Sequence, residues 1–216
     1  ITIAGQSATI SDMGGGKWVA TYAMQNGDSD GVIPFEVEGI LDLSGNPNSG
    51  TAATTDGSMV IFDNTKPELD IVRIASNNQD STWAKVGDMI SINFIANELL
   101  ISQSVNLNGQ AMTITDLGSE KYLAQYEMTD LDTEGQLSFE ILITDSVGLE
   151  SDPIITTSNS SLVIFDKTLP TLNQVNIQSN NQNNASIAIT GDNVTLTFIP
   201  EEPLLTDSIV VTIANE

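Results

Sequence analysis

The chain has 216 residues, of which 29 are Asp or Glu and 6 are Lys or Arg, so its formal net charge is −23 at pH 7. It contains no His and no Cys, which excludes a Ser-His-Asp triad, a thiol nucleophile, a zinc finger and a disulfide-stapled scaffold. A surface this acidic repels phosphate, and we expect no nucleic-acid partner. The 40% of hydrophobic residues predicts a packed core. No run approaches the roughly 18 to 20 apolar residues of a membrane span, so we expect no span in this segment.

The sequence repeats itself at an offset of 104 residues, which falls to 103 after one deletion. Four pairs of segments carry the repeat: 18–24 with 122–128, 58–63 with 161–166, 76–79 with 179–182, and 87–88 with 191–192. A repeat of this length predicts tandem copies of one structural unit.

We expect three parts, separated by linkers at Lys66-Pro67 and at residues 167–170. Residues 65–166 are one complete unit, residues 1–64 are the C-terminal part of a preceding unit, and residues 167–216 are the N-terminal half of a following one. Both ends of the chain align with the same predicted strand, which favours a window from a longer tandem array. The alternative is that the two half-units complete one another between neighbouring chains, as in a filament.

Each unit is predicted to consist of strands. Residues 90–94 and 194–198 alternate apolar and polar side chains, as a half-buried strand does, and no segment shows a helical period. The complete unit has seven predicted strands, near 69–75, 88–96, 103–108, 111–115, 120–128, 136–144 and 161–165. Seven short strands in about 100 residues are typical of an Ig-like sandwich of two sheets. The fold class is therefore all-β, a tandem array of Ig-like sandwiches, with Trp18 and Tyr122 as expected core aromatics.

Four segments resemble bacterial Ig-like tandem repeats: SNNQDSTWAKVGDMISINF from residue 76, LNGQAMTIT from residue 107, TDLDTEG from residue 129 and SLVIFDKTLP from residue 161. The resemblance covers nearly all of the chain. It implies a secreted or cell-surface location in a large adhesin-like protein, with a stalk or spacer role. The third unit departs from the pattern, since Ile187 to Thr190 stand where Trp83 to Val86 stand in the second.

Two acidic loops are candidate calcium sites. Asp130, Asp132 and Glu134 precede Gly135, and Asn26, Asp28 and Asp30 precede Gly31 at the aligned positions. Alternate oxygen ligands followed by Gly resemble the first half of an EF-hand loop. The closing Glu and the flanking helices are missing, which excludes an EF-hand and leaves a β-loop site or a solvated acidic turn.

A second candidate cation site lies at the junctions between units. Asp63 and Asp166 end the last predicted strand before each linker, Glu98 and Glu202 follow the second strand, and Asp42 and Asp145 precede a turn that contains Gly. A divalent ion that joins such groups would stiffen the hinge. The alternative is that these carboxylates bond turn amides and keep the chain soluble.

The sequence thus predicts a structural role rather than an enzyme, because a pair such as Asp130 and Asp132 lies in a short charged turn with no apolar pocket to raise one pKa. Its expected partners are neighbouring repeats and identical chains in a filament. The alternative is a carbohydrate- or protein-binding module, in which an exposed Trp83 would stack on a sugar.

Overall fold

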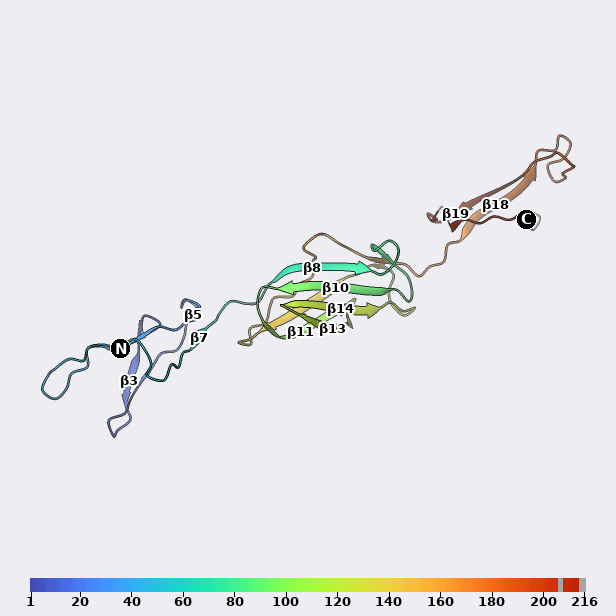
Figure 1. Cartoon of the computed structure of the whole chain (residues 1–216). Coiled ribbons are helices and arrows are strands. Elements are labelled where there is room, and N and C mark those ends of the chain that lie inside the picture. The colour runs from blue at the N-terminus through green and yellow to red at the C-terminus, as the bar shows by residue number, and fades with distance from the viewer. Residues whose placement is uncertain (206–207, 214–216) are drawn as a thin grey trace. The chain divides into compact units, whose positions relative to one another are not determined.

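The computed structural model describes residues 1–205 and 208–213 of the chain. They form two compact units, Ile1–Phe165 and Asp166–Glu216. The prediction of an all-β protein is confirmed, since the described residues contain strands and no α-helix (Figure 1). Accordingly, no helix with the length and apolar character needed to cross a membrane occurs in that part of the chain.

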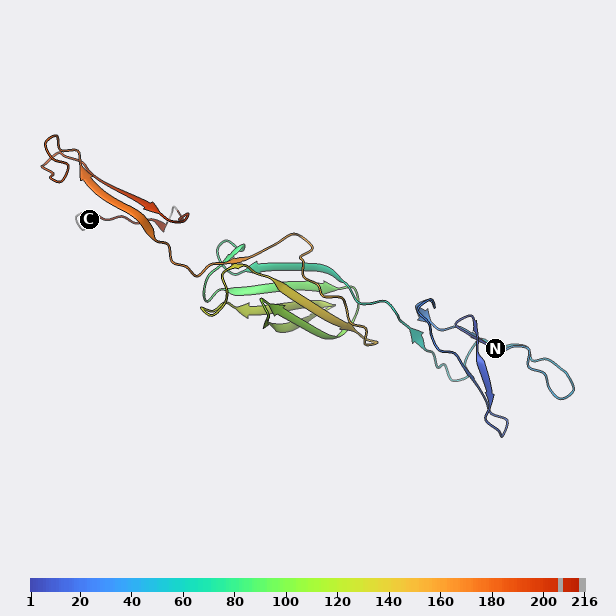
Figure 2. The ribbon, with the colours of Figure 1, turned by 180° about the vertical axis from the view of Figure 1, so that it is seen from behind.

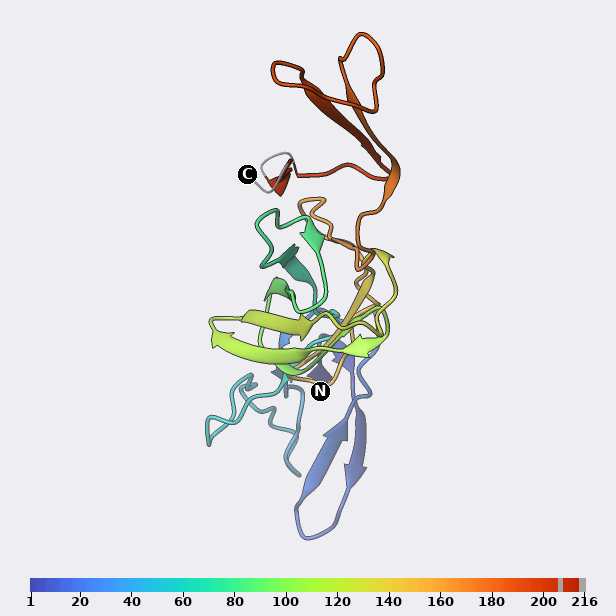
Figure 3. The same ribbon diagram turned by 90° about the vertical axis from the view of Figure 1, so that its right-hand side faces the viewer.

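Residues 1–64, here called the N-terminal segment, form three small sheets. Their strands are β1 (Thr2–Ile3), β2 (Gln6–Ser7), β3 (Thr9–Asp12), β4 (Trp18–Thr21), β5 (Gly31–Val32), β6 (Phe35–Glu36) and β7 (Ile61–Phe62). β1 pairs with β2 and β6, β5 pairs with β7, and β3 and β4 form the two-stranded ribbon seen in Figure 3. Residues Ala4 and Gly5 both have positive φ, 53° and 73°, which fits the two-residue turn that joins β1 to β2.

Residues 65–165, the central segment, contain a four-stranded sheet of order β13-β14-β10-β8. Its strands are β8 (Leu69–Ser76), β10 (Met89–Ala96), β13 (Thr113–Gly118) and β14 (Lys121–Glu127), and they lie side by side in Figure 1. β10 is central, because it pairs in antiparallel fashion with β8 along one edge and with β14 along the other.

Two three-stranded sheets complete the central segment. One has the order β12-β11-β16 and the other the order β15-β17-β9. Their strands are β9 (Trp83–Ala84), β11 (Leu100–Leu107), β12 (Gln110–Ala111), β15 (Gly135–Gln136), β16 (Phe139–Asp145) and β17 (Ile164–Phe165). β16 runs across the face turned to the viewer in Figure 2. All seven predicted strands of the complete unit thus have counterparts, and the two-residue strands β9, β12 and β15 are additional.

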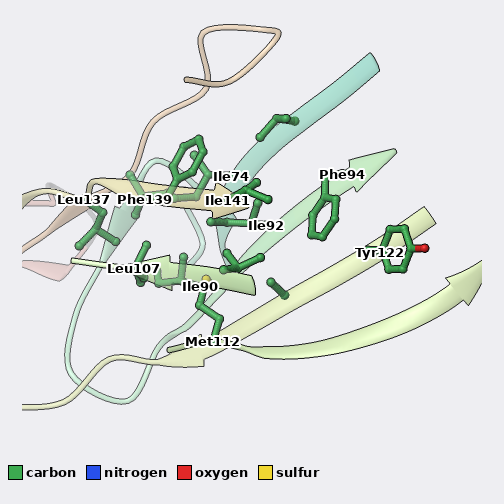
Figure 4. Close-up of a cluster of buried hydrophobic side chains, with 14 of the residues drawn as sticks. Ile74, Ile90, Ile92, Phe94, Leu107, Met112, Tyr122, Leu137, Phe139 and Ile141 are labelled. Carbon is green, nitrogen blue, oxygen red and sulfur yellow. The ribbon is translucent and has the colours of Figure 1, made fainter. Parts of the chain in front are cut away.

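The core of the central segment draws side chains from the four-stranded sheet and from the strands that face it. Ile90, Ile92 and Phe94 of β10 are at most 1% exposed, and they share one buried cluster with Leu107 of β11 and Ile141 of β16 (Figure 4). The alternation of buried and exposed positions along β10 is what its sequence predicts. Phe94 and Tyr122 stack with ring centroids 5.2 Å apart.

The second unit, from Asp166 onward, is the C-terminal segment and contains one antiparallel hairpin. β18 (Leu172–Ser179) pairs with β19 (Val194–Pro200). Its apolar side chains remain accessible, with Val175 57% and Ile177 60% exposed.

One prediction about the core is wrong. Tyr122 is buried as expected, at 3% exposure, but the aligned Trp18 is 63% exposed. The reason is that Tyr122 lies on β14 beside β10, whereas β4, which carries Trp18, pairs only with β3 among the described strands. Trp18 therefore has no neighbouring strand to bury its ring.

Candidate metal centre

Three carboxylates gather at one end of the central segment. Asp63 directly follows β7, Glu98 lies in the turn between β10 and β11, and Asp145 is the last residue of β16. One carboxylate oxygen from each lies within 4.8 Å of the other two. These residues, here called the acidic triad, are separated by 35 and 47 positions in the sequence, and all three belong to the predicted junction site.

Strand pairing explains how distant residues meet. In the register of β11 and β16, Asp145 lies opposite Leu100, which places the end of β16 beside the turn that carries Glu98. The same turn is bonded to the residue that follows the linker, because the Glu68 amide donates to Asn97 Oδ1 at 3.0 Å and the Asn97 amide donates to the Glu68 carbonyl at 3.1 Å. Pro67, buried between Asp63 and Glu68, limits the freedom of this stretch.

Asp145 is the most unusual member of the triad. Its side chain is fully buried, and its Oδ1 accepts hydrogen bonds from the amides of Val147 at 2.9 Å and Leu149 at 2.8 Å. Its Oδ2 is buried without a hydrogen-bond partner among the described residues. A buried charged oxygen of this kind costs several kcal/mol unless something compensates it. It is therefore the group on which a bound cation would act most strongly.

Asp42, the aligned residue of the preceding unit, has hydrogen bonds to both of its carboxylate oxygens in the same turn. Asp42 Oδ1 accepts from the amides of Ser44 and Asn46, both at 2.8 Å. Its Oδ2 accepts from the Asn46 side-chain amide at 2.9 Å. In the complete unit the position of Asn46 is taken by Leu149, which has no side-chain donor. Among the residues that the structure describes, no other donor takes its place at the second oxygen of Asp145.

The electrostatics of the triad favour a cation. Burial raises the pKa of Glu98, and the negative charges of Asp63 and Asp145 raise it further. The ammonium group of the neighbouring Lys66 forms its ion pair with Asp152, at 2.6 Å from Nζ to Oδ1, and not with the triad. Carboxylate oxygens in a partly buried cluster are the ligands that Ca²⁺ prefers, so the residues present fit a hard divalent ion.

The predicted β-loop sites have a different arrangement. Asp132 accepts from the hydroxyl of Tyr126 at 3.0 Å and from the amide of Thr129 at 2.7 Å. Asp28 does the same with Tyr22 at 3.2 Å and the amide of Gln25 at 2.7 Å. Each aspartate thus ties its loop to a tyrosine six residues earlier. The sequence carried the signal for this bond, because both repeats have Tyr at that spacing.

Among the residues that the structure describes, no carboxylate of either loop belongs to a group of three whose oxygens lie within 4.8 Å of one another. Asp30 bonds the linker, since its Oδ1 accepts from the Asn64 amide at 2.9 Å and its Oδ2 from the Thr65 hydroxyl at 2.6 Å. Asn26 and Asp130 are exposed turn residues, and Glu134 is exposed directly before β15. A calcium site in these loops stays a prediction.

The second predicted junction differs from the first in the described residues. Asp166 Oδ1 accepts from the Thr168 amide at 2.9 Å, just as Asp63 Oδ1 accepts from the Thr65 amide at 3.1 Å. Asp166 and Glu202 do not belong to a described group of three carboxylates. A cation site at this second junction stays a prediction.

Sequence reasoning missed a buried polar cluster around Asp88. Its carboxylate accepts from the Lys85 ammonium at 2.6 Å, the Lys85 amide at 2.9 Å and the Asn78 side-chain amide at 2.7 Å. In the C-terminal segment, Asn181 and Asp192 repeat the side-chain bond at 2.7 Å. The recurring Asn-Asn and Gly-Asp pairs were the signal, and this cluster holds the loop before β10 rather than a ligand.

Comparison with known proteins gives no relative from which a role could be transferred. The chain matches no protein-family model, no curated protein and no solved structure. What this chain does must therefore be argued from its own residues.

Proposed function

We propose that this chain is a run of structural repeats, of the Ig-like sandwich type, from a large bacterial protein that is secreted or displayed at the cell surface. In such an adhesin-like protein the repeats form a stalk that projects a tip, or the shaft of a filament. Their work is mechanical rather than catalytic, and calcium stiffens the linker between successive repeats. The proximity of Asp63, Glu98 and Asp145 is the observation that carries the proposal.

The position of the acidic triad supports a hinge lock. Asp63 belongs to the stretch that leads into the linker, whereas Glu98 lies in a turn of the central segment and Asp145 ends its strand β16. A divalent ion held by all three would fix the linker to that turn and to the end of β16. Ca²⁺ takes about six to eight oxygen ligands in flexible geometry, so waters or backbone carbonyls would supply the rest.

The linker bonds support the same reading. Asp30 holds Asn64 and Thr65 from the N-terminal side, and the turn at Asn97 holds Glu68 from the other. The short stretch between these two anchors contains the buried Pro67. Because both ends of the stretch are already restrained, an ion needs to order few residues, which lowers the entropic cost of binding.

The high negative charge supports the proposed role as a stalk at a surface. A net charge of −23 with few compensating cations makes neighbouring chains repel each other and keeps them soluble. The same repulsion weakens with ionic strength. A test of calcium binding must therefore hold ionic strength constant.

The experiment is a calcium titration at fixed ionic strength, in which thermal unfolding and small-angle X-ray scattering are followed together and magnesium is the control. Calcium at 100 times its Kd should stabilise the bound unit by about 2.7 kcal/mol, with a higher Tm and a stiffer particle. Magnesium should do less, because it demands octahedral geometry and gives up its waters reluctantly. If calcium and magnesium had equal effects, the triad would be a solvated acidic cluster without a specific ion, which would contradict the hinge lock.

A further inference from the structure

The chain contains two Asn-Gly pairs, Asn26-Gly27 and Asn108-Gly109. In such a pair the backbone nitrogen of the glycine can attack the side-chain amide carbon of the asparagine, because the glycine has no Cβ to obstruct the approach. Both asparagines are exposed to solvent. Sequence and exposure therefore do not separate the two pairs, and the difference between them lies in their hydrogen bonds and backbone conformations.

Asn108-Gly109 is fixed in place by Ser138. The pair forms the tight turn between β11 and β12, with φ of 47° and 82°. Asn108 Oδ1 accepts from the amide of Ser138 at 2.8 Å and from its hydroxyl at 3.0 Å, and the Asn108 amide donates to the Ser138 carbonyl at 2.8 Å. An attack by the Gly109 nitrogen would have to break the two bonds at Oδ1 and distort a turn whose two ends pair as strands.

Asn26-Gly27 lies in a turn whose described bonds join its two flanking residues. The Asp28 amide donates to the Gln25 carbonyl at 3.0 Å, and the Gln25 amide donates to Asp28 Oδ2 at 2.7 Å. Among the residues that the structure describes, neither the side chain of Asn26 nor the amide of Gly27 takes part in a hydrogen bond. Gly27 also lacks the positive φ of Gly109. Local motion of one exposed turn therefore suffices to bring the reacting groups together.

The aligned turn of the central segment carries a carboxylate at the position of Asn26. Asp130 stands there, and it is exposed as Asn26 is. The turn is closed in the same way, because the Asp132 amide donates to the Thr129 carbonyl at 3.3 Å and the Thr129 amide donates to Asp132 Oδ2 at 2.7 Å. An aspartate at this position is thus compatible with the turn.

We propose that Asn26 is a modification site at which the folded chain deamidates spontaneously, whereas Asn108 is protected by its bonds to Ser138. The reaction takes only water, and it gives the first loop the acidic residue that the aligned loop already has in Asp130. Each event adds one negative charge to a chain of net charge −23. This inference goes beyond the proposed stalk and does not depend on calcium.

The reaction balances without an oxidant or an enzyme. The Gly27 nitrogen loses its proton to hydroxide and attacks Cγ of Asn26. The bond from Cγ to the side-chain nitrogen breaks, and that nitrogen takes a proton from water and leaves as ammonia. One water molecule then opens the five-membered cyclic imide that results. The net change converts one side-chain amide and one water into one carboxylate and one ammonium ion, and its rate rises with pH because the attacking nitrogen must be deprotonated.

The imide opens in two ways, which have different consequences for the turn. Opening between the nitrogen and Cγ restores the normal backbone and leaves an aspartate, as in the aligned turn. Opening between the nitrogen and the main-chain carbonyl carbon gives isoaspartate, whose backbone is one carbon longer. The longer backbone should disturb the bonds between Gln25 and Asp28, and with them the bond from the Tyr22 hydroxyl to Asp28 at 3.2 Å.

The test incubates the folded chain at mildly alkaline pH and maps its tryptic peptides over time. Residues 18–73 and 86–121 form separate peptides, since trypsin does not cleave between Lys66 and Pro67. Fragment spectra assign each mass increase of about 1 Da to one asparagine. Asn26 should be converted at least about tenfold faster than Asn108. Equal rates, or faster conversion of Asn108, would overturn the proposal.

The matched control is the same incubation in urea, which removes the bonds of Ser138. In the unfolded chain the two pairs should react at rates within about threefold of each other, because both are exposed Asn-Gly sequences. The rate at Asn108 should rise, and the rate at Asn26 should change little. Reaction of Asn26 in urea but not in the folded chain would mean that its turn protects it, and the proposal would fail.

Two variants test the chemistry and the fit of the product. Gly27→Ala should slow the reaction, because the added methyl group obstructs the attacking nitrogen; an unchanged rate would contradict ring closure. Asn26→Asp should unfold at the same urea concentration as the original chain. A clearly lower midpoint would contradict the compatibility of the product with the turn.

Discussion

Asp42 and Asp145 hold the same turn in successive repeats, yet they differ in their second carboxylate oxygen. In Asp42 it accepts from the side chain of Asn46, and in Asp145 it is buried without a hydrogen-bond partner among the described residues. Asp145 is also the residue that joins Glu98 and Asp63 in the acidic triad. Asp42 is exposed, whereas Asp145 is fully buried. Both repeats therefore keep the turn, and they differ in whether the second carboxylate oxygen of the aspartate accepts a hydrogen bond from a side chain of that turn.

The first prediction follows from this difference. Asp145→Asn removes a negative charge from beside Glu98, whose pKa is raised by burial and by its two acidic neighbours. Without calcium, the variant should be more stable than the original chain, by about 1 to 3 kcal/mol, and calcium should no longer raise its Tm. Thermal unfolding with and without calcium measures both effects. Asp42→Asn is the control, and it should keep the calcium response. If calcium raised the Tm of Asp145→Asn as much as that of the original chain, the triad would not be the calcium site.

The second prediction concerns the bond between Tyr126 and Asp132. Tyr126→Phe removes one partly buried hydrogen bond and should destabilise the central segment by about 1 kcal/mol, as measured by urea unfolding. Its calcium response should be unchanged, because the loop is separate from the triad. Loss of the response would instead support a calcium site in the loop.

A pH effect follows from the same tyrosine. Burial, and then the hydrogen bond and charge of Asp132, raise the pKa of Tyr126 above 10.0. The folded state therefore keeps its proton where the unfolded state loses it. The stability from this group is complete below pH 10 and declines as the pH rises through the raised pKa. In Tyr126→Phe this alkaline decline should be smaller.

The third prediction concerns the stability of the folded chain at acid pH. Burial alone would raise the pKa of Asp88, but hydrogen bonds from Lys85 and Asn78 outweigh it, and the pKa lies below 3.8. The charged form thus stabilises the folded state above the unfolded pKa, and this contribution is lost as the pH falls through the lower folded value. Asp88→Asn should cost about 1 to 2 kcal/mol between pH 5 and 7.

Below pH 3.8 the difference between Asp88→Asn and the original chain should shrink. Urea unfolding at pH 7, 5 and 3 measures it. A constant difference over this range would mean that the ionised carboxylate is not what stabilises the loop.

The fourth prediction is a small effect. Lys66 and Asp152 form an ion pair at 2.6 Å, but their side chains are 54% and 88% exposed. Solvent screens such pairs, so Lys66→Ala should cost less than about 1 kcal/mol, and less still in 0.5 M NaCl. A double-mutant cycle with Asp152→Ala should give a coupling below about 0.5 kcal/mol. A larger, salt-resistant coupling would assign the pair a role in fixing the linker.

Several features could be predicted from the sequence because they are local or periodic. The alternation in residues 90–94 identified β10, and the spacing of Gly and Asn identified the turns. The repeat itself was visible as matched segments. Short-range patterns of this kind depend on backbone geometry and on which face of a strand meets water, and both can be recognised without tertiary contacts.

Only the tertiary structure decided which carboxylates meet. Asp130, Asp132 and Glu134 are close in sequence and form a candidate cation site there, but Asp132 bonds Tyr126, and in the described part of the chain the loop belongs to no group of three carboxylates. Asp63, Glu98 and Asp145 come from three different parts of the chain. The register of β11 and β16 brings Asp145 beside the turn of Glu98, and the bonds between Glu68 and Asn97 hold the linker that follows Asp63 to the same turn. Likewise, Trp18 and Tyr122 occupy aligned positions, and the presence or absence of a neighbouring strand determines which ring is buried. Burial and convergence depend on residues distant in sequence, so a repeated pattern alone could not determine them.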